Sequence, residues 1–401
     1  MNFIFVSPHF PYTYWQFCDR LRRNGVNVLG IGDAPYESLS WELKNSLTEY
    51  YKVNSLEDYD QVYRAVAYFA FRYGKIDWIE SNNEYWLEQD ARLRTDFNIT
   101  TGVQTNEIDS WKHKSSMKPF YAKAGIPTAR FHHVTTKRKA QNFIQKNGGY
   151  PVIAKPDVGV GAANTWKLEN DADLEEFFKI KPDVPYLIEE FVEGNIYSYD
   201  AIVDSHCEPL FESMTSFPPS IADIVNNDLD LFYFIGAEVP DELRKMGRAA
   251  LKAFNVRSRF VHFEFFRMDK AREGLGEVGD FVGLEVNMRP AGGYTPDMMN
   301  FAHSTDVYQI WADMVAYDKR MLPESGDDHW CVYAGRKEYL FEYEHSHEEI
   351  MEKYGSQIAM YEHMPEMNWA TMGSVSYTAH AYSEEEVREF MDFVQTRKEN
   401  A

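Results

Sequence analysis

An acid, an amide and an arginine alternate along one predicted strand in the segment GLEVNMRP. Successive side chains of a strand point to opposite faces, so Glu285, Asn287 and Arg289 share one face. The residues between them, Leu284, Val286 and Met288, give the other face an apolar character. Oxygen ligands suit magnesium, and a guanidinium suits phosphoryl or carboxylate oxygens. The pattern predicts a metal–phosphate site, although an amphipathic edge strand is the structural alternative.

A second carboxylate lies inside an aromatic strand, in the segment FVHFEFF. Glu264 falls 21 residues before Glu285, with a probable hairpin between them. A buried carboxylate is costly unless it is paired with a base or bound to a cation. Glu264 is therefore either a second magnesium ligand or the partner of a nearby lysine or arginine, and the segment alone leaves both interpretations open.

A lysine followed by a glycine-rich loop appears in the segment YPVIAKPDVGVGAAN. Lys155 ends an apolar strand, and Gly159 and Gly161 follow it. Glycines allow backbone N–H groups to approach phosphate closely, and a lysine adds a positive point charge. The order differs from that of a P-loop, in which the lysine follows the glycines. The segment indicates a phosphate-binding loop, with an ordinary hairpin as the alternative.

In series, these motifs resemble the ATP-grasp superfamily, particularly the branch that holds carbamoyl-phosphate synthase-like domains, biotin-carboxylase-like domains and carboxylate–amine ligases. The resemblance covers about residues 110–320, with the motifs in the family's order. It implies a ligase that uses ATP to activate a carboxylate as an acyl phosphate, which an amine then attacks, releasing ADP and phosphate. The implied cofactors are ATP and Mg²⁺, with two ions expected and Mn²⁺ also compatible.

The resemblance also implies roles for individual residues. Lys114, eleven residues before Gly125, matches the first phosphate-binding lysine of the family. Arg289 and Lys155 are the expected catalytic residues. The expected nucleotide contacts are Lys114, Lys155, Gly159, Gly161, Ala162, Glu189, Glu190, Val192 and Asp200. The expected magnesium ligands are Glu264, Glu285 and Asn287.

The segment from Glu189 to Gly194 matches the family's adenine hinge. The resemblance implies that the backbone of Glu190 and Val192 binds the adenine edge. Relatives often carry an acid two residues after the hinge glycine, but this chain has Ile196 there. Asp200 is the expected substitute, serving either the ribose or the substrate.

Three regions are expected to position these residues. Residues 1–111 alternate strands and helices and predict an open parallel α/β domain, the pre-ATP-grasp domain, without the GxGxxG of a dinucleotide-binding fold. Residues 112–324 are expected to form the ATP-grasp fold, with a lid subdomain at about 126–192. Residues 325–401 are expected to form a small α+β extension that completes the substrate pocket or provides a homodimer face.

The composition limits the class of partner and the compartment. A net charge of −22 makes nucleic acid a poor partner, because phosphate backbones are repelled. No apolar run approaches the length of a membrane span, and the N-terminus does not resemble a signal peptide. Three widely spaced cysteines fit a reducing, cytoplasmic compartment. The resemblance to ATP-grasp ligases implies a small-molecule carboxylate and an amine as partners.

Three other functions remain open from the sequence: a carboxylase that uses bicarbonate, a nucleotide-binding module without catalysis, and a structural α/β protein. The chain has no AMKM-like biotinyl segment, which counts against the carboxylase. The segments expected to contact the substrate are Ser7–Tyr14, Glu80–Glu84 and Gly292–Asp297.

Overall fold

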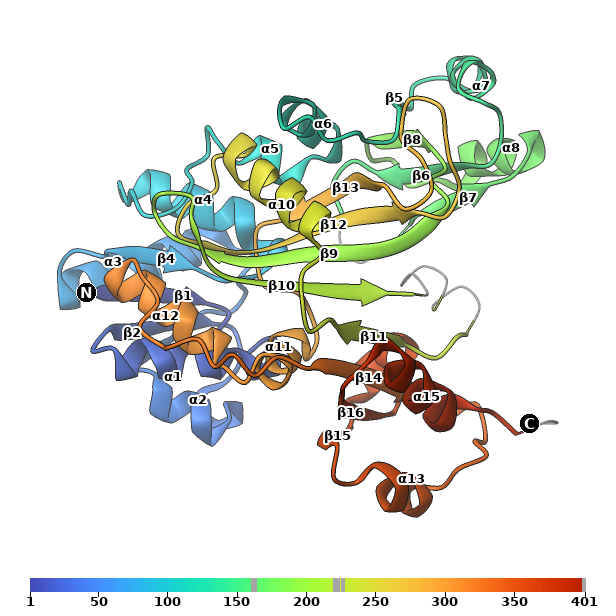
Figure 1. Cartoon of the computed structure of the whole chain (residues 1–401). Helices are drawn as coiled ribbons and strands as arrows, with labels where there is room; N and C mark the ends of the chain where they lie inside the picture. Colours follow the sequence, from blue (N-terminus) through green and yellow to red (C-terminus); the bar gives the residue numbers. More distant parts are fainter. Residues whose placement is uncertain (160–163, 219–223, 225–227, 399–401) are drawn as a thin grey trace.

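The computed structural model describes residues 1–159, 164–218, 224 and 228–398, and three β-sheets organise this part of the chain (Figure 1). One sheet is parallel and the other two are antiparallel. Helices cover the parallel sheet and the smaller antiparallel sheet, as the alternation of strand and helix patterns in the sequence predicted. The expected mixture of α/β and α+β architecture is confirmed.

The N-terminal sheet has the strand order β3-β2-β1-β4, and all its pairs are parallel. Its strands are β1 (Asn2–Val6), β2 (Asn27–Gly32), β3 (Glu49–Lys52) and β4 (Trp78–Glu80). Its helices are α1 (Trp15–Arg23), α2 (Trp41–Ser46), α3 (Tyr59–Tyr73) and α4 (Leu87–Asp96), with short 3₁₀ turns at Tyr12–Tyr14, Tyr36–Ser38 and Glu84–Trp86. Parallel neighbours require such helical crossovers, so the sheet follows from the β–α–β pattern.

The second sheet has the order β5-β8-β6-β7 and lies in the region predicted to be the lid subdomain, so it is called the lid below. Two helices, α5 (Asp109–Lys112) and α6 (Lys114–Lys123), lead into it. Its elements are β5 (Phe131–His133), α7 (Lys137–Lys146), β6 (Val152–Pro156), β7 (Trp166–Leu168), α8 (Asp171–Ile180) and β8 (Tyr186–Glu190). Apolar residues of α7 and α8 pack on the sheet in a core of their own, separate from the main core.

The third sheet has eight strands in the order β13-β12-β9-β10-β11-β14-β16-β15. Its strands are β9 (Gly194–Val203), β10 (Pro209–Phe217), β11 (Phe232–Ile235), β12 (Arg259–Met268), β13 (Phe281–Asn287), β14 (Trp330–Arg336), β15 (Ile358–His363) and β16 (Val375–Ala381). Strands β14 to β16 extend the sheet that holds β12 and β13, so the described residues after 325 continue the eight-stranded sheet and do not form a sheet of their own.

Six described helices lie between or after the strands of the eight-stranded sheet in the sequence, from residue 241 to residue 395. They are α10 (Asp241–Ala253), α11 (Thr295–Ala302), α12 (Val307–Tyr317), α13 (His347–Tyr354), α14 (Trp369–Met372) and α15 (Glu384–Gln395), with a 3₁₀ turn at Glu366–Asn368. Helix α12 packs against α1, where Trp311 meets the rings of Phe5 and Phe17. These contacts join the N-terminal domain to the large sheet.

The hairpin of β12 and β13 brings the two predicted acidic strands together. Glu264 pairs with Glu285, and His262 pairs with Asn287. The register shifts between Glu264 and Phe265, because one extra residue of β13 lies opposite this point. This irregularity turns Leu284 toward the same cavity as Glu285, so the expectation that Leu284 shares the buried apolar face was wrong.

A buried ion cluster ties the N-terminal domain to β12. Glu80 accepts from Arg94 at 3.0 Å and from Arg259. Burial alone would raise the pKa of Glu80, but the two guanidinium groups outweigh it and lower the pKa. Both arginines and Glu80 are almost fully buried, so Glu80 joins domains and does not meet a substrate as the sequence analysis expected.

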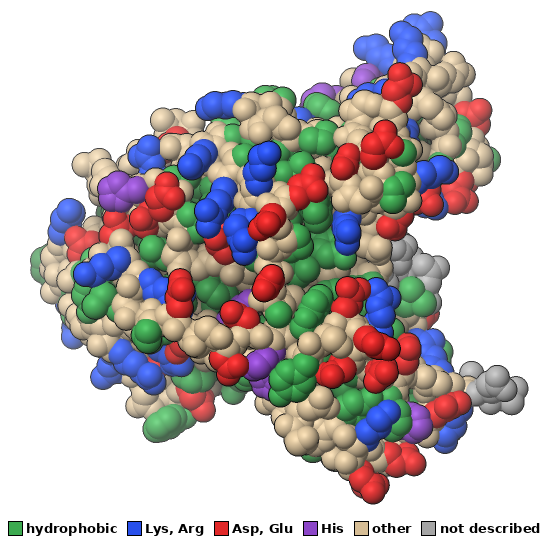
Figure 2. Space-filling model, in the orientation of Figure 1, with side chains coloured by type: hydrophobic (Ala, Val, Ile, Leu, Met, Phe, Trp, Pro, Cys, Tyr) green, Lys and Arg blue, Asp and Glu red, His purple; other side chains and the backbone are tan. Residues whose placement is uncertain are grey.

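Acidic and basic side chains are mixed over the visible face of the molecule, and the lid and the C-terminal region stand apart with a recess between them (Figure 2). Within the described ranges, every helix is too short or too polar to cross a membrane.

Candidate active site

A cavity of about 590 Å³ lies where the lid, the β12–β13 hairpin and the C-terminal region meet. Residues of α6, the lid strands, β12, β13 and α14 line it. The predicted site residues that line it are Lys114, Lys155, Gly159, Glu189, Glu190, Val192, Glu264, Glu285, Asn287 and Arg289. Residues that are up to 175 positions apart in the sequence therefore share one cavity.

The two carboxylates predicted as metal ligands face the cavity from adjacent strands. Like charges directly opposite each other in a sheet repel, so Glu264 and Glu285 need nearby cations. The Nζ atom of Lys114 lies 3.0 Å from Oε2 of Glu285 and donates to the carbonyl of Gly159 at 3.1 Å. Burial would lower the pKa of Lys114, but the carboxylate of Glu285 raises it overall.

His262 supports the other carboxylate of the pair. Its Nε2 lies 3.2 Å from Oε1 of Glu264, and its Nδ1 lies 2.7 Å from Oδ1 of Asp200. Burial would lower the pKa of His262, but the two carboxylates raise it to about 9. The imidazolium therefore holds Glu264 in place at neutral pH.

Asp200 does not line the cavity. It is fully buried in β9, where Ser198 and Thr215 donate to it alongside His262. All its neighbours are protein groups, so direct contact with a ribose does not fit this position. The expectation that Asp200 replaces the missing acid at Ile196 does not fit, because Asp200, although on the same face of β9 as Ile196, lies four residues farther along and is fully buried beside His262.

The donor set of the hairpin fits magnesium. Two carboxylates and the amide oxygen of Asn287 face the cavity, while the Nδ2 of Asn287 has no hydrogen-bond partner within the described chain. The described residues hold no cluster of three or more His, Cys, Asp or Glu side chains that could enclose a metal ion. Magnesium commonly takes one or two carboxylates and completes its shell with water and phosphate oxygens.

A buried cluster of two lysines and one glutamate lies beside the carboxylate pair. The Nζ of Lys155 is 2.7 Å from Oε2 of Glu189, and the Nζ of Lys118 is 2.8 Å from Oε1. Burial would raise the pKa of Glu189, but Lys155 and Lys118 lower it to about 2. Both lysines line the cavity, so two positive charges are presented to it across one carboxylate.

Lys118 is a candidate nucleotide contact that the sequence analysis missed. It lies four residues after Lys114 in α6, and residues with this spacing share a helix face. The spacing in the sequence could have identified it, once the segment was taken as a helix.

We expect Glu189→Gln to lower the free energy of unfolding by about 3–5 kcal/mol, because Lys155 and Lys118 lose their buried counter-charge. Urea denaturation followed by tryptophan fluorescence measures this change at neutral pH. Glu193→Gln is the matched control, because Glu193 is exposed and forms only a surface ion pair. Equal stability of the wild type and Glu189→Gln would show that Glu189 does not hold the lysines.

The same variant has a defined pH dependence. The pKa of Glu189 falls from 4.5 to about 2 on folding, so its contribution to stability is complete above pH 4.5. That contribution is lost as the pH falls toward about 2. The wild type should therefore lose stability more steeply than Glu189→Gln below pH 4.5, and parallel curves would contradict this assignment.

Glu190 has a structural role within the lid. Its carboxylate is held by Arg130 at 2.6 Å and by Arg272, from the β12–β13 loop, at 2.8 Å. Its backbone N–H donates to the carbonyl of Arg130 at 3.0 Å. This N–H is therefore already bonded within the protein, and the expected contact between the backbone of Glu190 and an adenine edge stays a prediction. Val192, the next expected hinge residue, lies just past the end of β8 and lines the cavity.

The glycine-rich loop is only partly described. Gly159 lines the cavity, and its carbonyl accepts from Lys114. Gly161 and Ala162, the other two expected nucleotide contacts of this loop, lie outside the described residues.

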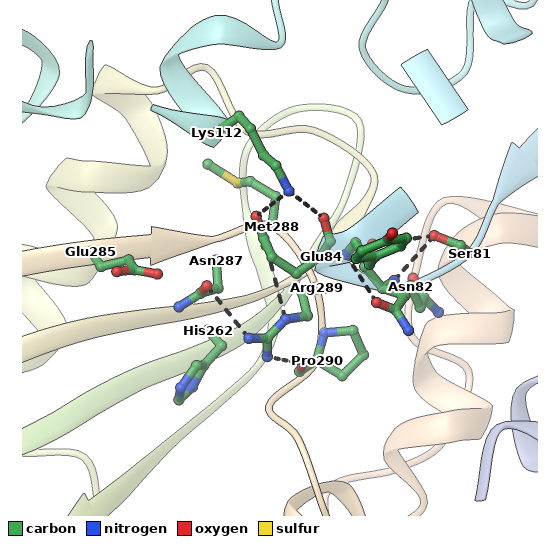
Figure 3. A network of polar contacts seen from close by, with 12 residues as sticks. Ser81, Asn82, Glu84, Lys112, His262, Glu285, Asn287, Met288, Arg289 and Pro290 are labelled. Carbon is green, nitrogen blue, oxygen red and sulfur yellow. Dashed lines mark hydrogen bonds and ion pairs between the residues drawn. The ribbon is translucent and has the colours of Figure 1, made fainter. Parts of the chain in front are cut away.

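Arg289 lies two residues after the last residue of β13, Asn287, and both side chains line the cavity (Figure 3). Its Nη1 donates to the carbonyl of Pro290 at 2.8 Å, and its Nη2 lies 3.5 Å from Oδ1 of Asn287. Its Nε lies 3.9 Å from Oε2 of Glu84. Burial raises the pKa of Glu84 despite the nearby cations Arg289 and Lys112. The guanidinium is thus oriented by Pro290, Asn287 and Glu84, and it also lines the cavity.

The expected substrate segments differ in where they lie. Gly292, Gly293 and Thr295 line the cavity, whereas no residue of the loop 7–14 does. The physical reason is the chain path, since the loop after Arg289 leads directly from the site into α11.

No protein-family model matches the chain. A curated relative, the carbamoyl phosphate synthase large chain of Methanosarcina mazei, is 24% identical over 129 residues, which is 31% of this chain and 12% of that protein. The match thus spans only about an eighth of the relative's length.

Two solved structures resemble nearly the whole chain. The L-amino acid ligase from Bacillus licheniformis has a TM-score of 0.68 and 14% identity, covering 98% of this chain and 97% of the ligase. The biotin carboxylase domain of the Hydrogenobacter thermophilus 2-oxoglutarate carboxylase, solved with MgADP, ADP and bicarbonate, has a TM-score of 0.66 and 14% identity. It covers 99% of this chain and 90% of the domain.

The chain therefore has the ATP-grasp fold, as the order of its motifs predicted. The match to the carbamoyl phosphate synthase large chain covers 31% of this chain, and that protein belongs to the branch that the motifs resemble.

Proposed function

We propose that the protein is an ADP-forming ligase that activates a carboxylate as an acyl phosphate and joins it to an amine. One observation carries the proposal: two lysines, two carboxylates, an amide and an arginine from distant parts of the chain line one cavity. Each of these groups suits one part of a nucleotide–metal–carboxylate complex. The L-amino acid ligase and the biotin carboxylase domain, which share this fold and are named for ligation and carboxylation, support the same class of chemistry.

In the proposed complex, Lys114, Lys118 and Lys155 bind the phosphates of ATP. Glu189 keeps Lys118 and Lys155 in position between turnovers. The base of the nucleotide lies beside Val192, at the end of the lid sheet. Phosphoryl transfer depends mainly on such positioning and on neutralising spread negative charge.

Glu264, Glu285 and Asn287 are the residues that would hold magnesium. The metal would supply neutralisation of the phosphate oxygens. Lys114 now forms the ion pair with Glu285, so binding of nucleotide would draw its ammonium toward the phosphates and release Glu285 as a ligand. His262 keeps Glu264 oriented throughout.

Arg289 is placed to bind the substrate carboxylate. One carboxylate oxygen attacks the γ-phosphorus, the bond to the β-phosphate oxygen breaks, and ADP leaves. The amine nitrogen then attacks the acyl carbon, phosphate departs with the bonding electrons, and the nitrogen loses a proton. Arg289 stabilises the negative charge in both steps, and closure of the lid excludes water from the acyl phosphate.

A phosphate-release assay tests the proposal. Purified protein with ATP and Mg²⁺ is screened against pairs of amino acids and small carboxylic acids, with ADP and the coupled product both measured. Release of ADP and phosphate in equal amounts, dependent on both a carboxylate and an amine, is the expected result. Turnover that requires bicarbonate would favour a carboxylase, and nucleotide binding without any turnover would favour a non-catalytic module.

A further inference from the structure

The cavity continues beyond the carboxylate pair into an aromatic chamber, defined here by Phe217, Leu231, Tyr233 and Met372. Phe217 ends β10, Tyr233 belongs to β11, and Met372 ends α14. The neighbouring residues Gly292, Gly293, Thr295 and Thr371 add only uncharged groups. Among the described residues, this end of the cavity presents no charged side chain of its own.

The chamber lies at the opposite end of the cavity from the hinge. Along one face of β12, Phe266, Glu264 and His262 line the cavity in succession. Phe266 packs with Val192, beside the hinge, whereas His262 meets the ring of Phe217 edge-on at 6.2 Å. A strand rises about 3.4 Å per residue, so the two ends are separated by roughly 13 Å. The base and the occupant of the chamber therefore need not compete.

The rings of Phe217 and Tyr233 line the chamber, and the buried ring of Tyr333 stacks behind Tyr233. The ring centroids of Phe217 and Tyr233 are 5.3 Å apart at an interplanar angle of 23°. Those of Tyr233 and Tyr333 are 4.9 Å apart at 25°, because the two residues are paired across β11 and β14. Aromatic and other large apolar groups favour offset contact with such rings.

The hydroxyl of Tyr233 is a buried polar group at the wall of the chamber. Tyr233 is only 3% exposed, and its hydroxyl has no hydrogen-bond partner within the described part of the chain. The hydroxyl of nearby Thr295 donates to the carbonyl of Gly292 at 2.7 Å, and its lone pairs can still accept from Tyr233. The hydroxyl of Tyr233 therefore gives an otherwise apolar chamber one polar point, which Thr295 or a bound molecule can share.

The C-terminal region forms the remaining wall of the chamber through Met372. The carbonyl of Met372 accepts from the hydroxyl of Tyr333 at 2.9 Å, and a Cβ on Gly335 would lie 2.2 Å from that carbonyl oxygen. The Met372 methyl group lies 3.0 Å from the place where Gly293 would carry a Cβ. Two glycines therefore let α14 and its methionine close against the loop that follows Arg289.

We propose that the aromatic chamber binds the side chain of the carboxylate substrate, and that this side chain is aromatic or similarly large and apolar. The inference rests on the proposed ligase function, because it places the reacting carboxylate at Arg289 with its side chain in the chamber. An acidic or basic side chain finds no counter-charge on the chamber's described walls, and burying it there is costly. A glycine substrate has no side chain, so it would make no contact with the aromatic rings of the chamber or with Met372.

Trapping of the acyl phosphate with hydroxylamine tests the inference without knowledge of the natural amine. The carboxylate attacks the γ-phosphorus and ADP leaves; hydroxylamine nitrogen then attacks the acyl carbon, phosphate leaves, and a hydroxamate forms with loss of a proton. Phenylalanine, leucine, glycine and aspartate are compared with ATP and Mg²⁺. Since one methylene in an apolar pocket changes kcat/KM about 10- to 200-fold, phenylalanine or leucine should exceed glycine and aspartate by at least about 10-fold.

Two methionines from the same region provide the matched variants. Met372→Ala should raise the KM for phenylalanine about 10-fold and leave the KM for ATP unchanged, with Met372→Leu restoring it. Met367→Ala is the control, because Met367 is 77% exposed. An unchanged KM for phenylalanine in Met372→Ala, or a raised KM for ATP, would overturn the inference.

The hydroxylamine screen distinguishes a failure of the chamber's assignment from a failure of the proposed ligase function. Hydroxamate from glycine or aspartate at rates equal to phenylalanine would overturn the apolar chamber and leave the ligase function standing. A complete lack of ADP formation with every carboxylate would overturn the ligase function, and the chamber's assignment with it.

Discussion

Arg289→Ala is expected to lower kcat about 100- to 1,000-fold, the loss seen when one preorganised group that stabilises a developing oxyanion is removed. The guanidinium lines the cavity, and Asn287 and Pro290 orient it. ATP affinity should change little, because Lys114 and Lys155 form the proposed phosphate site independently. The measurements are ADP formation in the presence of both substrates and ADP binding by calorimetry.

Arg257→Ala is the control for this variant, because Arg257 is an exposed arginine with a contact only to Asn255. Turnover by Arg289→Ala at the wild-type rate would remove Arg289 from the mechanism. A large loss of ADP affinity would place Arg289 on the nucleotide instead of the carboxylate.

Glu285→Gln is expected to lower kcat/KM for ATP by at least about 100-fold at a fixed Mg²⁺ concentration. Even groups that only support a metal ligand cost 10- to 100-fold when they are replaced, so a direct ligand should cost no less. The substitution keeps the shape of the side chain and removes the charge that now pairs with Lys114 at 3.0 Å. Activity is titrated against Mg²⁺ for both proteins.

Calorimetry gives a readout for Glu285→Gln that does not depend on turnover. The wild type should bind ADP more tightly with Mg²⁺ than without it, and the variant should lose most of this difference. Glu193→Gln again serves as the exposed control. Equal enhancement by Mg²⁺ in wild type and variant would show that Glu285 is not a metal ligand.

Local pattern was sufficient to predict the parallel N-terminal sheet and the acid–amide–arginine face. The period of two in GLEVNMRP places Glu285 and Asn287 on the cavity side of β13, and Val286 on the buried side. Leu284 escaped this rule because the register shift beside Glu264 depends on the partner strand. Asp200 shows a different limit: it shares a face of β9 with Ile196, but contacts with Thr215 of β10 and His262 of β12 bury it.

Contacts between distant residues explain what the motifs missed. Glu190 was predicted to contact the nucleotide through its backbone, and the motif gave no sign that its carboxylate pairs with Arg130 and Arg272, which lie 60 and 82 residues away in the sequence. Lys118 became a candidate only when Glu189 was found beside it. Such pairings depend on how the lid and hairpin approach each other.

The sequence by itself determined the chemistry available to this protein: two phosphate-binding lysines, two acids, an amide and an arginine, in the order of the ATP-grasp motifs. Side-chain alternation and turn residues are local properties, so they can be identified in the sequence before the fold is known. Only the tertiary structure decided that Met372 and Tyr233 close one cavity with Arg289. Strand order and register across 140 residues set that arrangement, and no short segment encodes them.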